Sequence, residues 1–196
     1  MTYLNPPDAS TLDEVKDELA FVAMAMGFEA NSMKIMAHRP GILRGFLGLM
    51  APVIGPDAVL DAGLRQMVAH IASAAAGCRY CQAHTAHGAD HAGVSRDKIE
   101  ALWTYADSPL FSDAERAALH LAQAAGSVPN QTEASHFEAV KAHFSEPEIV
   151  EIVAVISAFG FLNRWNDTFA TSLEDSPLAF AEASLSSAGW TAGKHG

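Results

Sequence analysis

The sequence has little cysteine: two residues among 196, at Cys78 and Cys81. This scarcity excludes a disulfide-rich secreted scaffold, and a bridge across so short a loop constrains little of the unfolded chain. The first residues also lack the basic start and apolar run of a secretory signal. We therefore expect a cytoplasmic protein whose two thiols are catalytic or metal-binding more often than structural.

Basic residues and long apolar runs are also scarce. The chain has 12 Lys and Arg against 23 Asp and Glu, which gives a formal net charge of −11 at pH 7. Binding to nucleic acid depends on clustered positive charge, so we expect no nucleic-acid partner. No stretch reaches about 18 uninterrupted apolar residues, so we also expect no membrane span and no membrane partner.

Strand signals are missing as well. The sequence has neither period-two alternation nor Asn-Gly and Asp-Gly turns, while apolar residues recur at helical spacing throughout. The length suits one domain. We predict a single all-α domain, 1–196, with an N-terminal helical layer at 11–55 and a packed but irregular tail at 172–196. The expected helices cover 11–26, 29–38, 41–53, 57–76, 78–91 and 96–106.

Two further helix starts are marked by capping boxes, Ser112-Asp-Ala-Glu115 and Ser145-Glu-Pro-Glu148. In this motif the Ser side chain and the Glu three residues later satisfy each other's free backbone amides. The helix after Ser145 is apolar on almost every side, so it should lie in the middle of the bundle or between subunits. Because apolar faces would otherwise stay exposed, we expect a homo-oligomer, at least a dimer.

The two cysteines have the spacing of one helical turn, so Cys78 and Cys81 lie on one face of a helix. Gly77 breaks the preceding helix, which places both sulfurs near a helix start. The free amides and positive dipole end there stabilise a thiolate and make a reversible disulfide feasible. His84 follows three residues after Cys81 and could accept a thiol proton. Helix position alone favours Cys78 as the more acidic thiol.

Three other interpretations fit the same segment. The cysteines could be two small buried apolar residues. They could bind zinc together with His84 and either His87 or His91, although side chains from one helix fan outward instead of converging on a metal. Finally, the histidines could be solvated residues on a helix face, which is the interpretation we prefer for His87 and His91.

The cysteine segment resembles the AhpD-like branch of the carboxymuconolactone decarboxylase superfamily. The similarity rests on Gly77-Cys-Arg-Tyr-Cys-Gln-Ala-His-Thr, between an Ala-rich helix that starts Leu-Arg-Gln-Met and the residues Ala92-Gly-Val. It extends over about residues 40–170. The matching stretches beyond the core are Glu115-Arg-Ala-Ala-Leu, Glu148-Ile-Val-Glu-Ile-Val and Phe161-Leu-Asn-Arg.

The resemblance implies a helical homo-oligomer with thiol peroxidase or disulfide-exchange activity. It implies no metal, haem, flavin or other cofactor, and its partners would be a hydroperoxide and a dithiol reductant. In members with peroxidase chemistry the second cysteine of the motif attacks the peroxide and the first condenses with the resulting sulfenic acid. If these roles are transferred to this sequence, Cys81 is the peroxidatic residue and Cys78 is the resolving one. This assignment agrees with the general oxidation chemistry of paired thiols.

Two positions depart from the pattern of the family. The family's proton relay starts at a Glu, and this chain has Gln66 there, an amide that orients groups but carries no proton. The family's usual His is replaced by Thr85, while His84, one position early, points to the same helix face and could substitute for it. The end of the apolar helix, Asn163-Arg-Trp-Asn-Asp167, is unexpectedly polar. It is either a helix end with a capped and paired Arg164, or Asn163 or Arg164 lines the cysteine pocket.

A non-redox function of the same fold is the main alternative. Here a small molecule would bind near Gln66, His84 and Asn163, and the cysteines would be incidental. The decarboxylase branch itself fits less well, because its members need no cysteine pair.

Overall fold

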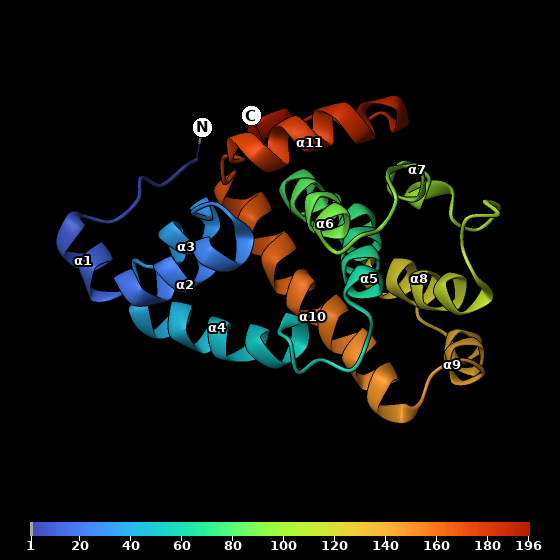
Figure 1. Cartoon of the computed structure of the whole chain (residues 1–196). Helices are drawn as coiled ribbons and strands as arrows, with labels where there is room; N and C mark the ends of the chain where they lie inside the picture. Colours follow the sequence, from blue (N-terminus) through green and yellow to red (C-terminus); the bar gives the residue numbers. More distant parts are fainter. Residues whose placement is uncertain (1) are drawn as a thin grey trace.

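The computed structural model describes residues 2–196, and within that range it contains helices and connecting segments but no strand (Figure 1). Eleven α-helices and three short 3-10 turns form one domain. The prediction of a single all-α domain is therefore confirmed. None of the described helices is both long and apolar enough to cross a membrane.

Four helices form the N-terminal layer: α1 (Ala9–Glu14), α2 (Lys16–Met26), α3 (Asn31–Met36) and α4 (Pro40–Ile54). We expected one helix over 11–26, but the chain breaks at Val15, whose φ of −122° leaves the helical region while its side chain becomes fully buried. Gly27 ends α2 in the left-handed conformation, as its position in the sequence indicated.

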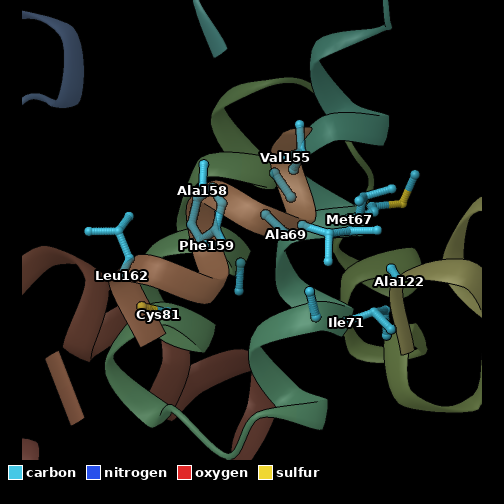
Figure 2. Packing of buried hydrophobic residues seen from close by; sticks show 14 of the residues in the cluster. Met67, Ala69, Ile71, Cys81, Ala122, Val155, Ala158, Phe159 and Leu162 are labelled. Atoms are coloured by element: carbon cyan, nitrogen blue, oxygen red, sulfur yellow. The ribbon is translucent and has the colours of Figure 1, made fainter. Parts of the chain in front are cut away.

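Helix α5 (Ala62–Ala75) lies at the centre and packs against α6 (Arg79–His91), α8 (Asp113–Gly126) and α10 (Glu146–Phe169) (Figure 1). Small residues line these contacts, so the helix axes approach closely. Figure 2 shows part of the buried cluster, in which Cys81 belongs to the same core as Phe159 and Leu162 of α10. The buried alanines of these four helices are Ala69, Ala72, Ala83, Ala86, Ala89, Ala117, Ala118, Ala122, Ala124 and Ala158.

The start of α5 differs from the predicted start at residue 57. Asp61 is the N-cap, and its carboxylate accepts the Leu64 N–H at 3.0 Å. Just before it, the N–H groups of Val59 and Leu60 donate to the carboxylate of Glu151 at 2.7 and 3.0 Å. These amides are therefore satisfied from α10, and the chain needs no helix before Asp61.

Both capping boxes are confirmed, at the starts of α8 and α10. The segment predicted as a helix over 96–106 is shorter, because α7 (Arg96–Glu100) gives way to a 3-10 turn, η1 (Leu102–Thr104). Helix α9 (Ala134–Lys141) connects α8 to α10.

Helix α10 contacts α4, α5, α6 and α8, so it occupies the middle of the bundle, as expected. Part of its apolar surface nevertheless faces solvent in the isolated chain: Val150 is 68% and Phe161 42% exposed. This exposed surface is the feature that motivated the expectation of an oligomer, which stays a prediction.

The tail at 172–196 is more regular than predicted. It contains α11 (Asp175–Leu185) and the 3-10 turns η2 (Ser186–Ala188) and η3 (Gly193–His195). Helix α11 buries Phe180, Ala181 and Leu185 and packs along α6 (Figure 1). These three residues form the apolar stripe of the helix. The stripe is hard to detect in the sequence because the residues around it are small. The C-terminal segment, residues 171–196, therefore covers the helix that carries the cysteines.

The close approach of α8 to α5 gives a test of this packing. A Cβ added at Gly126 would lie 2.7 Å from the backbone oxygen of Ala72. We expect Gly126→Ala to lower the free energy of unfolding by about 1–3 kcal/mol, measured by urea denaturation. The matched control is Gly45→Ala in α4, where nothing lies within 4 Å. There we expect stabilisation of about 0.4–1 kcal/mol, and equal effects at both positions would contradict the packing.

Candidate active site

The two cysteines lie at the start of α6. Gly77 adopts a left-handed conformation with φ of 79°, which turns the chain back after α5. Cys78 then becomes the N-cap of α6, and its Sγ accepts the backbone N–H of Cys81 at 3.5 Å. Both are free thiols, 0% and 2% exposed. The predicted helix break and the shared helix face are thus present.

The two thiols have different surroundings, which shift their pKa values in opposite directions. The Cys81 thiol donates to the Cys78 sulfur, and with the Cys81 backbone N–H it lowers the pKa of Cys78 in spite of burial. Burial raises the pKa of Cys81 well above its ordinary value, and the adjacent Cys78 raises it further. Cys78 is therefore the residue at which a thiolate is stabilised, as its position at the helix N-terminus indicated.

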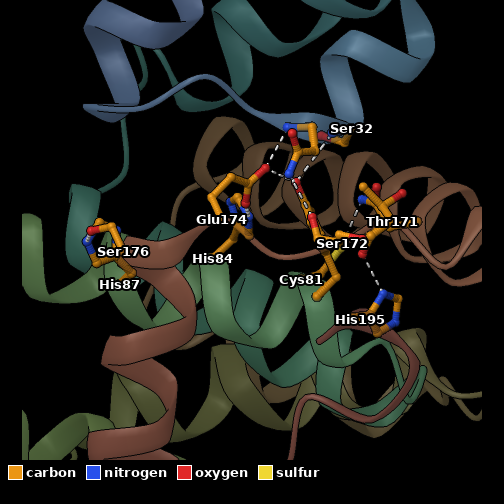
Figure 3. Close-up of polar contacts among 12 residues, drawn as sticks. Ser32, Cys81, His84, His87, Thr171, Ser172, Glu174, Ser176 and His195 are labelled. Carbon is orange, nitrogen blue, oxygen red and sulfur yellow. Dashed lines mark hydrogen bonds and ion pairs between the residues drawn. The ribbon is translucent and has the colours of Figure 1, made fainter. Parts of the chain in front are cut away.

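His84 faces a carboxylate instead of a sulfur. Its Nε2 lies 2.6 Å from Oε2 of Glu174, the residue just before α11 (Figure 3). The Tyr80 hydroxyl donates to Oε1 of Glu174 at 2.9 Å, and the Asn31 N–H donates to the same oxygen at 2.5 Å. Among the described residues no hydrogen bond joins His84 to Cys78 or Cys81. His84 consequently does not take a thiol proton directly in this arrangement.

Glu174 is a site residue that our sequence reasoning missed. Burial acts to raise its pKa, but the hydrogen bonds from His84, Asn31 and Tyr80 outweigh burial and leave the pKa lowered. An ionised carboxylate is therefore held beside α6 by groups from α3 and α6. Its only sequence signal was local, the helix-start pattern Glu174-Asp-Ser-Pro.

Gln66 lies away from this network. Its amide packs against α6 at Gly88, where an added Cβ would be 2.7 Å from the Gln66 Oε1. Among the described residues the Gln66 side chain has no hydrogen bond to Thr85 or His84. Position 66 therefore lacks the carboxylate that the family pattern has there. The carboxylate next to α6 comes instead from Glu174, near the C-terminus of the chain.

Thr85 is buried and joins the cysteine turn to α5. Its hydroxyl donates to the Cys81 carbonyl at 2.7 Å, and its Oγ1 lies 3.1 Å from Nδ1 of His70. Burial lowers the pKa of His70 to about 4, so the ring is neutral at neutral pH. We missed His70, although it follows Gln66 by four residues and so shares its helix face.

Helix α10 contributes two buried amides. Asn166, not Asn163, contacts the pair: its Nδ2 donates to the Cys81 Sγ at 3.6 Å. Asn163 is 4% exposed, and neither polar atom of its side chain has a partner among the described residues. The prediction that Asn163 lines the cysteine pocket stays a prediction.

The zinc interpretation finds no convergent ligand set. His87 Nε2 lies 3.1 Å from the Ser176 hydroxyl, and His91 Nδ1 lies 2.9 Å from the His87 carbonyl. Because His84 binds Glu174, the imidazoles of His84, His87 and His91 each have a different partner. Residues 2–196 contain no group of three or more His, Cys, Asp or Glu side chains arranged to hold a metal ion.

Comparison with known proteins finds relatives of this chain. The carboxymuconolactone decarboxylase family matches residues 40–124. The uncharacterised protein YnjA of Escherichia coli (strain K12) is 31% identical over 107 residues, which span 55% of this chain and 59% of YnjA. The match thus covers less than two thirds of that curated relative.

Two solved structures extend the comparison over nearly the whole chain. A complex of a cysteine-to-alanine variant of the debrominase Bmp8 with 2,3,4-tribromopyrrole is 30% identical, with a TM-score of 0.85 over 93% of this chain and 97% of Bmp8. The AhpD core of an uncharacterised peroxidase-related protein from Ralstonia eutropha JMP134 is 23% identical, with a TM-score of 0.80 over 92% and 95%. The second likeness shows the fold.

The buried carboxylate gives a pH-dependent prediction. The pKa of Glu174 in the folded chain lies below its ordinary value of 4.5, so its stabilisation is present above that value and is lost as the pH falls through the folded pKa. We expect Glu174→Gln to lower the free energy of unfolding by about 1.5–3 kcal/mol at neutral pH, because three donors lose a charged acceptor. In urea denaturation the difference from wild type should shrink below pH 4.5.

The control for this variant is Glu182→Gln on the exposed side of α11, which should change stability little at either pH. An undiminished loss for Glu174→Gln in acid would mean that charge at Glu174 is not the cause.

Proposed function

Because the chain belongs to the AhpD-like branch of the carboxymuconolactone decarboxylase family, we propose that it is a thiol-dependent oxidoreductase that reduces a hydroperoxide with Cys78 and Cys81. The observation that carries this proposal is the pair of free thiols at the start of α6, one favoured as thiolate and the other as thiol. A nucleophile and a proton-bearing resolving group thus lie side by side.

The reaction uses both sulfurs. The Cys78 thiolate attacks one oxygen of the hydroperoxide, the O–O bond breaks, and the other oxygen leaves as an alcohol after it takes up a proton. Cys78 is now a sulfenic acid. The Cys81 thiol attacks its sulfur, an S–S bond forms, and water leaves. An external dithiol then exchanges with this disulfide, which restores both thiols and oxidises the dithiol.

This order reverses the one that the resemblance implies. In that order Cys81 attacks the peroxide and Cys78 resolves the sulfenic acid. The electrostatics favour Cys78 as the attacking residue, because its sulfur accepts hydrogen bonds from Cys81 while burial holds Cys81 protonated.

Glu174, His84 and Tyr80 act as positioning residues in this scheme. The ionised carboxylate binds Tyr80 and His84, which stack on one another with ring centroids 4.3 Å apart. Since Tyr80 lies between the two cysteines in sequence, this network fixes the first turn of α6. None of the three side chains needs to touch the peroxide.

Access to the pair requires movement, because both sulfurs are buried. The C-terminal segment closes over the start of α6: Arg79 donates to the Thr191 carbonyl at 2.8 Å, and the Trp190 indole donates to the Arg79 carbonyl at 3.3 Å. Trp190 is itself buried, whereas Arg79 is half-buried and Thr191 is exposed, so the outer edge of this contact faces solvent. We infer that oxidant and reductant reach the sulfurs when the residues around Thr191 separate locally from α6, while Glu174 and α11 stay in place.

Reductive dehalogenation is the second candidate, favoured by the similarity to the debrominase along nearly its whole length. The thiolate would take bromine from an aryl carbon: the C–Br bond breaks, an S–Br bond forms, and the carbon takes up a proton. Attack by the second thiol would then form the S–S bond and release bromide and a proton. The cysteine pair ends as the same disulfide.

The proposal predicts which cysteine reacts first. Reduced wild-type protein treated with one equivalent of cumene hydroperoxide should lose two hydrogens from the peptide that contains both cysteines, as seen by mass spectrometry. Cys81→Ser should accumulate a sulfenic acid on Cys78 that a dimedone probe traps. Cys78→Ser should react at least about tenfold more slowly, because the favoured thiolate is gone.

Trapping on Cys81 in Cys78→Ser at the wild-type rate would establish the order implied by the resemblance. Unchanged wild-type thiols would overturn the peroxidase proposal. In that case 2,3,4-tribromopyrrole replaces the peroxide, and bromide release coupled to the same loss of two hydrogens would support the second candidate.

A further inference from the structure

A cavity of about 270 Å³ lies beside α6, between α5, the segment α7–η1 and the C-terminal segment. Neither cysteine lines it. We propose that this cavity binds a small, uncharged, planar aromatic molecule that carries a hydroxyl or N–H group. The inference does not rest on the proposed redox function.

The polar recognition group is His70. Its Nδ1 lies 3.2 Å from the Gln82 carbonyl, which only accepts hydrogen bonds, so Nδ1 carries the proton. The Thr85 hydroxyl donates its own proton to the Cys81 carbonyl, so it too accepts from Nδ1. The neutral ring therefore keeps its lone pair on Nε2. A ligand must supply the matching donor.

Nε2 of His70 is the group left for such a donor. Among residues 2–196 it has no hydrogen-bond partner, and His70 lines the cavity although only 4% of the residue is exposed. Nε2 is not sealed from solvent, because the cavity opens onto it, and a bound hydroxyl or N–H would take the place of water at this acceptor.

The residues that line the cavity determine the shape and the charge of the ligand that fits. Small residues, Ala74 and Gly77 on one side and Ala188 and Gly189 on the other, leave the space open, while Trp103 and Trp190 provide flat apolar surface. Aromatic rings stack favourably on such walls. Arg79 and Glu100 bring one charge of each sign, and Arg79 is already bonded to the Thr191 carbonyl, so the lining favours no net charge in the ligand.

Phenol and anisole make a matched pair of probes, because they share the ring and only phenol donates a hydrogen bond. The three tryptophan indole N–H signals in a ¹H–¹⁵N NMR spectrum of the full chain report the site. Phenol should shift the Trp103 and Trp190 signals saturably, with a dissociation constant of about 1 mM, while Trp165, on α10 and outside the cavity, stays unchanged as the internal control. Anisole should bind at least about tenfold more weakly.

Two variants test the assignment. Ala74→Leu places a larger side chain in the cavity, and leucine is compatible with the helix, so this variant should weaken phenol binding at least about tenfold. Ala139→Leu, at an exposed position of α9, should leave phenol binding unchanged. His70→Leu should abolish the preference for phenol over anisole. Because His70 is buried and its variant could fail to fold, Ala74→Leu tests the cavity without any change at His70.

Three results would overturn the inference: equal affinity for phenol and anisole, shifts at all three indoles alike, or unchanged binding in Ala74→Leu. The variant in which both cysteines are serine should bind phenol like wild type. Failure of the peroxide reaction and failure of phenol binding are therefore distinguishable.

Discussion

The reversal of the chain at Gly77 is the constraint on which the site depends. Helix α5 ends two positions before this left-handed residue and α6 starts two positions after it, so the Cys78 sulfur becomes the acceptor for the first turn of the helix. The same turn buries Cys81 beneath it, against α10. One backbone conformation thus shifts the pKa values of two chemically identical side chains in opposite directions: the Cys78 sulfur accepts from the Cys81 thiol and from backbone N–H groups, while burial dominates at Cys81 in spite of the Asn166 amide.

A buried carboxylate then ties this turn to distant parts of the chain. Glu174 accepts hydrogen bonds from Asn31 in α3 and from Tyr80 and His84 in α6, and it stands at the start of α11. The N-terminal layer, the cysteine helix and the C-terminal segment therefore share one charged centre. Such a charge is tolerated in a nearly dry location because it is fully hydrogen-bonded.

Local patterns predicted most of the architecture and the cysteine turn. Helical periodicity and the capping boxes at Ser112 and Ser145 depend on neighbours a few residues away, and the structure confirms both boxes. The contacts around the cysteines are long-range: Glu174 lies 90 positions from His84, and Asn166 lies 85 from Cys81. No spacing rule links such positions, so sequence reasoning assigned His84 to a sulfur when its partner is a carboxylate. The helical tail was missed for a related reason, since its apolar stripe has meaning only against α6.

His70 has a consequence of a different kind. An ordinary imidazole changes from acceptor to donor within the range of pH found in cells. Here burial lowers the pKa of His70 to about 4, and the carbonyl of Gln82 fixes the proton on the opposite nitrogen. The ring therefore behaves as an acceptor of constant polarity, comparable to a backbone carbonyl but with a single directed lone pair. A compartment that turns mildly acidic would leave the hydrogen-bonding character of this residue unaltered.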